Sequence, residues 1–167
     1  MKIIEIKVYS FDELSEEAKK KALDKHIENN DYYFLENYLE NRLTDYLAEA
    51  KITANDKPKI YYSLSCSQGD GAMFVGSFSW NGYNVDIKQS GHYYHYNSKV
   101  ITVSDEEGNE VDGEPETAFD DIYVSICKKL EKDGYEFIEY DDSMENFQQA
   151  CEANDYTFTQ DGVMKNS

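Results

Sequence analysis

Two glycines flank an acidic side chain in the segment Ser67-Gln68-Gly69-Asp70-Gly71-Ala72. This pattern could bind a ligand or could form a tight turn. Successive amides in a glycine turn can point at an anion, which would make a phosphate-binding nest. A phosphate loop also needs a lysine and a following helix, which are missing here, and Asp70 would repel the anion. We therefore expect a tight turn with both glycines at positive φ, or else a polar recognition site around Asp70.

The segment Gly91-His92-Tyr93-Tyr94-His95-Tyr96 is the second group of chemically useful side chains. On a strand its two histidines fall on opposite faces, so we expect no shared metal ion. With Tyr61, Tyr62 and Tyr83 the tyrosines could form an aromatic, hydrogen-bonding platform, or simply a half-buried sheet face beneath the helices. The predicted binding residues of the two motifs are Gln68, Gly69, Asp70, Gly71, His92, Tyr93, Tyr94, His95 and Tyr96.

The acidic loop Asp105–Glu116 partly follows the oxygen spacing of a calcium loop. It lacks the glycine at the sixth position and a helix before the loop, so we expect a solvated acidic loop and no metal. No nucleophile and base are paired in the sequence, and carboxylates are too plentiful for any pair to be informative. The sequence predicts neither an enzyme nor a cofactor.

Charge is the most unusual property of the 167-residue chain, which carries 34 acidic and 16 basic side chains for a net charge of −18. Residues 90–167 hold 19 Asp and Glu against 5 Lys, a net of −14. Such a surface repels nucleic acid and anionic membranes and attracts basic proteins. The predicted acidic interaction surface consists of Asp105, Glu106, Glu107, Glu110, Asp112, Glu114, Glu116, Asp120, Asp141 and Asp142.

The cysteines and the apolar content indicate where the protein works. Three cysteines, with Cys66 and Cys127 on apolar faces, favour buried free thiols in a reducing compartment. We expect no signal peptide and no membrane helix, because no apolar run approaches the ~20 residues that one needs. The expected location is the cytoplasm.

Periodicity predicts the elements that would position these residues. The predicted helices are 15–28, 32–50, 117–132 and 144–153, with Ser15 and Ser143 as caps and Gly134 ending or weakening the third. The predicted strands are 3–8, 59–66, 73–80, 83–89, 92–104 and an edge strand at 156–159. Asn81-Gly82 is the strongest hairpin pattern, and residues 162–167 should fray. The fold class is α+β: one domain over 1–167, with a meander of about four strands plus terminal edge strands in a mainly antiparallel sheet, and helices packed on one face.

Four stretches resemble a family of small bacteriophage and prophage proteins loosely labelled "antitoxin of toxin–antitoxin stability system". They are Leu14-Ser15-Glu16-Glu17-Ala18-Lys19-Lys20-Lys21-Ala22, Ser67-Gln68-Gly69-Asp70-Gly71-Ala72 followed by Phe74 and Gly76, Gly91-His92-Tyr93-Tyr94-His95-Tyr96-Asn97-Ser98, and Ala153-Asn154-Asp155-Tyr156-Thr157-Phe158-Thr159-Gln160-Asp161-Gly162. The chain departs from the family at Gly134, where a helix runs on in relatives, and in its long acidic loop. The resemblance implies a phage protein in an infected bacterium.

Resemblance and charge together predict a phage-encoded inhibitor of a host nucleic-acid-handling or defence factor, of the anti-CRISPR or anti-restriction type. Such a protein could act as a nucleic-acid mimic whose partner has a basic surface. One alternative is a binder of a small planar or nucleotide-like ligand at Ser67–Ala72 and Gly91–Ser98. The other is an antitoxin paired with a toxin.

Overall fold

The computed structural model describes residues 2–165, which form two compact units. The sheet unit is Phe34–Glu136, and the terminal unit comprises residues 2–33 together with 137–165. The α+β class is confirmed, with a mostly antiparallel sheet and four α-helices in the described range. The prediction of one domain stays a prediction, because division into compact units does not establish whether either part folds alone.

Five antiparallel strands make up the main sheet, with β4 at its centre. The strands are β2 (Ile52–Ala54), β3 (Lys59–Ser63), β4 (Gly71–Trp80), β5 (Tyr83–Gln89) and β6 (Lys99–Ser104). β5 pairs with one edge of β4, while β2 and β3 follow one another along its other edge. The predicted Asn81-Gly82 hairpin is confirmed: both residues have positive φ, 51° and 83°, as a tight turn between twisted strands requires.

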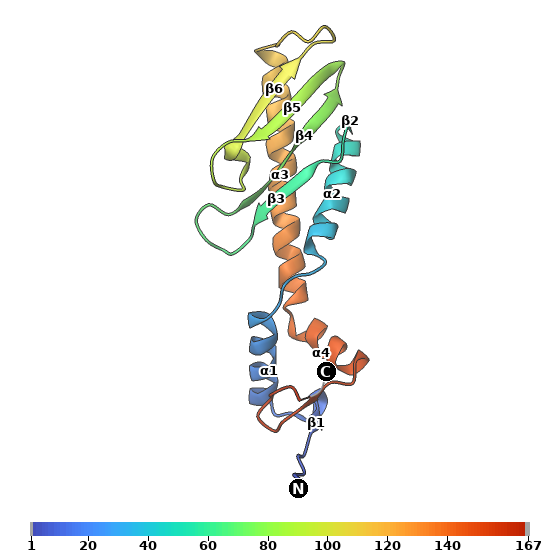
Figure 1. Ribbon diagram of the computed structural model, residues 1–167, viewed down its shortest axis with the longest axis vertical. Helices are drawn as coiled ribbons and strands as arrows, with labels where there is room; N and C mark the ends of the chain where they lie inside the picture. The colour runs from blue at the N-terminus through green and yellow to red at the C-terminus, as the bar shows by residue number, and fades with distance from the viewer. Residues whose placement is uncertain (1, 166–167) are drawn as a thin grey trace. The chain divides into compact units, whose positions relative to one another are not determined.

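Two helices cover one face of this sheet (Figure 1). α2 (Leu35–Glu49) packs next to β2 and β3, and α3 (Glu114–Asp141) runs along the sheet face. Apolar residues at helical spacing on α3 meet alternate residues of the strands, so that Phe74 contacts Tyr123 and Trp80 contacts Phe119. The fully buried side chains of this core include Leu39, Phe74, Phe78, Val85, Ile87, Phe119, Tyr123 and Leu130.

One tyrosine supports the sheet where a strand pairing stops. β5 pairs with β4 only as far as Gly76 opposite Ile87. Two residues further along β4, the Tyr123 hydroxyl accepts a hydrogen bond from the Phe74 N–H (3.2 Å) and donates one to the Phe74 carbonyl (2.8 Å). A side chain from α3 thus satisfies backbone groups that would otherwise be buried without partners.

The terminal unit has its own apolar core. It contains β1 (Tyr9–Ser10), the short 3₁₀ helix η1 (Phe11–Glu13), α1 (Glu16–Glu28), α4 (Met144–Ala153) and β7 (Thr157–Phe158), with β1 antiparallel to β7. Phe11 packs edge-on against Phe147 and Phe158 at centroid distances of 5.3 and 5.8 Å. The predicted caps are confirmed, because the hydroxyls of Ser15 and Ser143 each accept a hydrogen bond from the amide three residues later. Among residues 2–165, α1 and α4 belong to this unit, whereas α2 and most of α3 belong to the sheet unit.

Several predicted element boundaries are wrong, among them the following three. α3 is continuous through Gly134. Residues 3–8 have no regular secondary structure and no strand partner, and pairing starts only at Tyr9. Residues 162–165 are ordered, because the amides of Thr159 and Lys165 donate to the carbonyls of Val163 and Thr157 and close a small hairpin; residues 166–167 lie outside the described range.

Candidate functional site

The Asp70 carboxylate organises the loop between β3 and β4. The Ser65 and Ser67 amides donate to it at 2.8 and 3.2 Å, and the hydroxyls of Ser63, Ser65 and Ser67 donate at 3.1–3.2 Å. The Tyr135 hydroxyl on α3 donates as well. These hydrogen bonds, that of Tyr135 above all, hold the pKa of Asp70 far below its usual range. Asp70 is therefore ionised and cross-links the loop from within. Its carboxylate oxygens already accept hydrogen bonds from groups of the protein itself.

Tyr135 is the partner that sequence reasoning missed. It lies 65 residues from Asp70 along the chain and directly follows Gly134, the only glycine of α3. Burial and the neighbouring Asp70 carboxylate raise the pKa of Tyr135 to about 12, so at neutral pH its hydroxyl is a donor. The Cys66 amide donates to the same hydroxyl at 3.2 Å. Loop and helix are thus joined by a two-step hydrogen-bond chain.

The loop itself differs from the tight turn that was expected. It extends over residues 64–70, and its positive φ values belong to Cys66 (57°) and Gly69 (88°). Gly71 is the first residue of β4 and has no positive φ, so the prediction of two left-handed glycines is half right. Because β3 ends at Ser63, Cys66 is exposed in the loop, and its predicted burial is wrong.

The two sequence motifs meet in space. A Cβ on Gly69 would lie 2.7 Å from Cδ1 of Tyr93, and a Cβ on Gly71 would lie 2.7 Å from Cδ2 of His95. Both rings therefore rest directly on glycine backbone, which explains why these positions lack side chains. The sequence predicts one candidate site from the two motifs, and the structure brings Gly69 and Gly71 of the first against Tyr93 and His95 of the second.

The segment from Gly91 to Ser98 is not the strand that was predicted. The His95 ring Nδ1 accepts the Asn97 amide at 3.0 Å, and the Ser98 amide donates to the His95 carbonyl at 2.8 Å. These local hydrogen bonds close the 3₁₀ turn η2 (Tyr96–Ser98), and β6 begins only at Lys99. His92 and His95 therefore lie in a loop, and within residues 2–165 no three His, Cys, Asp or Glu side chains are grouped to hold a metal ion.

An exposed aromatic surface remains once these contacts are made. Tyr94 stacks on Tyr61 of β3 with ring centroids 5.2 Å apart, and His95 lies against Tyr96 at 3.9 Å. Tyr93 and Tyr94 still expose 62% and 40% of their surface. We call the exposed residues Gln68, His92, Tyr93 and Tyr94 the tyrosine surface. The prediction that Tyr62 and Tyr83 belong to the same aromatic platform is wrong. These two tyrosines lie opposite Ala72 and Trp80, whose side chains face the helices.

The predicted acidic interaction surface is divided between the two units. Asp141 and Asp142 belong to the terminal unit, where Asn30 donates to both (2.6 and 3.1 Å) and Tyr32 donates to Asp142 (2.6 Å). Asp120 in the sheet unit pairs with Lys99 at 2.8 Å. These three carboxylates therefore already have polar partners within their own units.

The remaining acids of the predicted surface lie in and after the turn that follows β6. Asp105 accepts the amides of Glu107 and Asn109, both at 2.9 Å, and these bonds, chiefly that of Asn109, lower its pKa. The bridge between Ser104 and Glu110 continues the pairing, so this acidic segment is an ordered turn. Its exposed carboxylates are Glu106, Glu107, Glu110 and Asp112. The predicted loop is too long at its end, because exposed Glu114 and half-buried Glu116 lie in the first turn of α3. We call these six acids together the acidic turn.

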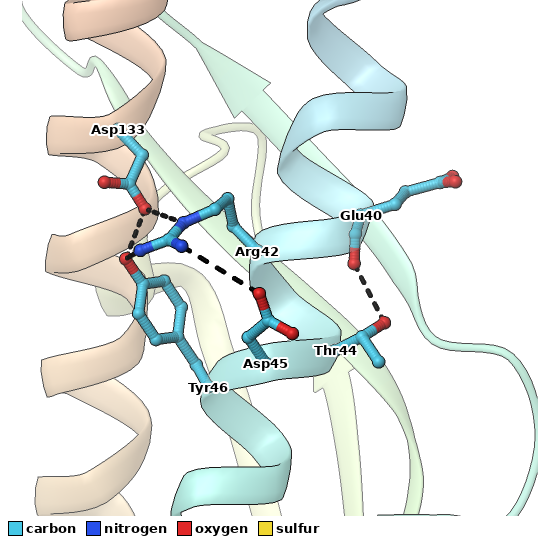
Figure 2. A network of polar contacts seen from close by, with 6 residues as sticks. All are labelled: Glu40, Arg42, Thr44, Asp45, Tyr46 and Asp133. Atoms are coloured by element: carbon cyan, nitrogen blue, oxygen red, sulfur yellow. Dashed lines mark hydrogen bonds and ion pairs between the residues drawn. The ribbon is translucent and has the colours of Figure 1, made fainter.

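A second polar network joins α2 to α3 around Arg42 (Figure 2). The Arg42 guanidinium donates from Nε to Asp133 (3.2 Å) and from its terminal nitrogen to the Tyr46 hydroxyl (2.8 Å), and that hydroxyl donates to Asp133. Burial first, and then the Asp133 carboxylate, raise the pKa of Tyr46. Arg42 is the only arginine of the chain, which is the one sequence feature that could have marked it. The network is structural, because both acceptor groups are buried.

Comparison with protein-family models, curated proteins and solved structures finds no match for this chain. Among the described residues, no helix has the length and apolar character needed to cross a bilayer.

Proposed function

We propose that this protein is a binding protein that uses the tyrosine surface and the acidic turn to engage a basic protein. The proposed partner is a host factor that handles nucleic acid or takes part in defence, in the setting of a phage-infected bacterium. The observation that carries the proposal is the pair of exposed tyrosines on a loop that is locked to the sheet. No catalytic group is part of the proposal.

The tyrosine surface has the properties of a binding hot spot. Tyrosines supply large amphipathic contact area and lose little conformational freedom on binding. Here that freedom is already restricted, since Tyr93 rests on Gly69 and Tyr94 stacks on Tyr61. A surface ordered before binding avoids part of the entropy cost of forming a complex.

Charge supports a basic partner. The net charge of −18 attracts a positively charged protein over distance and repels DNA, RNA and anionic membranes. The acidic turn places six carboxylates within eleven residues, 106–116, which contain no lysine or arginine. Such a surface can compete with nucleic acid for a basic groove, as a nucleic-acid mimic would.

The small-ligand alternative has weaker support. It relied on Asp70 as the polar recognition group, and six donors within the protein already surround that carboxylate. An antitoxin would use the same surfaces on a toxin, so it differs from the main proposal only in the partner's identity.

The proposal is tested by capturing partners from host lysate on the immobilised full-length chain at low and high salt, and then measuring the purified partner's affinity. Y93S/Y94S should weaken binding at least about tenfold, because two hot-spot side chains are lost. E106Q/E107Q/E110Q should mainly slow association and reduce its salt dependence. The matched control is Y140S, because Tyr140 is a 59% exposed tyrosine of the terminal unit. Equal affinity for all four proteins would overturn the proposal.

A further inference from the structure

The N-terminal arm, residues 2–8, is an exposed segment with the sequence pattern of a β-strand. All seven residues are exposed, and Ile3, Ile4, Ile6 and Val8 expose 88, 77, 61 and 44% of their surface. Large β-branched residues at alternating positions 4, 6 and 8 are typical of strands. This is the densest group of exposed aliphatic side chains in the described part of the chain.

The arm already continues a strand. It leads directly into β1, which pairs with β7 on one side only. β1 has no second strand partner within residues 2–165, so one of its edges is open. On the far side of β7, Phe158 bridges to Met164. The Lys7 ammonium lies 5.5 Å from the centroid of the Tyr9 ring, as expected when residues two apart share one face of an extended chain. An apolar edge of this kind pairs readily with another strand.

We propose that the arm pairs antiparallel with the same arm of a second copy of this chain, with Ile6 on the two-fold axis. In that register Ile6 faces Ile6 and Ile4 faces Val8, so one face of the ribbon is entirely aliphatic. On the opposite face Glu5 lies across from Lys7, and Ile3 lies across from Tyr9. Every cross-strand pair from Ile3 to Tyr9 is therefore either apolar or oppositely charged, which are the stabilising combinations.

Neighbouring registers lack this match. Centring the pair on Glu5 would place Glu5 against Glu5 and Ile3 against Lys7. Centring it on Lys7 would place Lys7 against Lys7. An axis between Glu5 and Ile6 would pair aliphatic with charged side chains at its centre, Glu5 with Ile6 and Ile4 with Lys7. Self-complementarity around one residue is the property that a two-fold symmetric interface requires, and it selects a second copy over an unrelated strand.

The interface is small, so the dimer is expected to be weak and to depend on protein concentration. It would join β1 of the two copies into one ribbon, with β7 outside each. The dimer does not depend on what the tyrosine surface binds.

Sedimentation of the full chain tests the dimer. Wild type should show reversible dimerisation, and I6D should be monomeric over the same concentrations because it places two carboxylates on the axis. E5K and K7E should each weaken the dimer, since like charges then face one another, and E5K/K7E should restore it. A wild type that stays monomeric up to about 1 mM, the limit of weak association, would overturn the proposal, as would dimers that persist in I6D or a double variant that fails to recover.

Cross-linking tests the register, in a C66S background that removes the exposed native thiol. I6C should form a disulfide-linked dimer on mild oxidation, because paired Cα atoms lie about 4.5–5.5 Å apart. I3C is the matched control: in the proposed register its two introduced thiols would lie about 20 Å apart and should not cross-link. Cross-linking of I3C as fast as I6C would exclude the register with Ile6 on the axis.

Discussion

The side chain of Leu64 occupies the space beside Gly134 in which any larger residue would need its Cβ. That Cβ would lie 2.3 Å from Cδ1 of Leu64, closer than two carbon atoms can approach. Leu64 belongs to the same loop that Asp70 fastens to Tyr135. Gly134 thus leaves room for the Leu64 side chain within α3, and it does not end the helix.

Replacing this glycine should therefore destabilise the protein although alanine favours helices. G134A gains roughly 1 kcal/mol of helix propensity, and displacing the Leu64 side chain should cost about 1–3 kcal/mol, so the net loss should be at most about 2 kcal/mol. L64A/G134A should lose much less than the sum of the single variants, because the clash is gone. Urea unfolding measures all three; additive losses would show that Leu64 is not the obstacle.

Asp70 should make stability depend on pH. Its pKa is lower in the folded protein than the usual value of about 3.9, so the unfolded chain binds that proton more tightly. The stabilisation is complete above about pH 5 and is lost as the pH falls through the usual Asp range toward the depressed pKa. The difference in unfolding free energy between wild type and D70N should accordingly be largest at neutral pH and shrink in acid. Comparing these two proteins cancels the titration of the other acids, and a difference that grows in acid would contradict this reading.

The Tyr123 hydroxyl should contribute more to stability than an ordinary hydrogen bond. Y123F keeps the ring but leaves both backbone groups of Phe74 unpaired in a fully buried site. We expect a loss of about 2–4 kcal/mol in the free energy of unfolding. Y93F, at an exposed position, is the control and should change stability by less than about 0.5 kcal/mol. Equal effects would mean that water replaces the lost hydroxyl.

The three thiols should differ sharply in reactivity. Cys66 is exposed, whereas burial raises the pKa of Cys127 to about 12 and that of Cys151 to about 11. A thiol-specific reagent at mildly alkaline pH should modify one cysteine rapidly in the folded protein and all three in denaturant. C66S should remove the rapid phase. Rapid modification of Cys127 would mean that the sheet unit opens readily.

Features fixed by neighbours in the sequence were predictable. The Asn81-Gly82 turn and the caps at Ser15 and Ser143 depend on residues within one turn of the chain, and all three are confirmed. Gly134 and Gly71 were misread because the side chains that require them, Leu64 and His95, come from distant segments.

The candidate site follows the same division. The sequence proposed one site from two unusual motifs, and two contacts do join these motifs, Gly69 with Tyr93 and Gly71 with His95. Its internal arrangement was not, because the Tyr135 hydroxyl reaches Asp70 across 65 residues and local hydrogen bonds replace the expected strand before Lys99.

The Arg42 network has a consequence for recognition. The chain's only guanidinium is turned toward Asp133 and Tyr46, and every other strong cation of the sequence is a lysine. Ammonium groups offer point charges, whereas the two-pronged grip that suits a phosphodiester needs the planar fork of an arginine. Because the Arg42 guanidinium already binds Asp133 and Tyr46, gripping a phosphodiester with it would break a contact between α2 and α3. We therefore expect weak binding of nucleic-acid backbones, as the net charge of −18 also predicts.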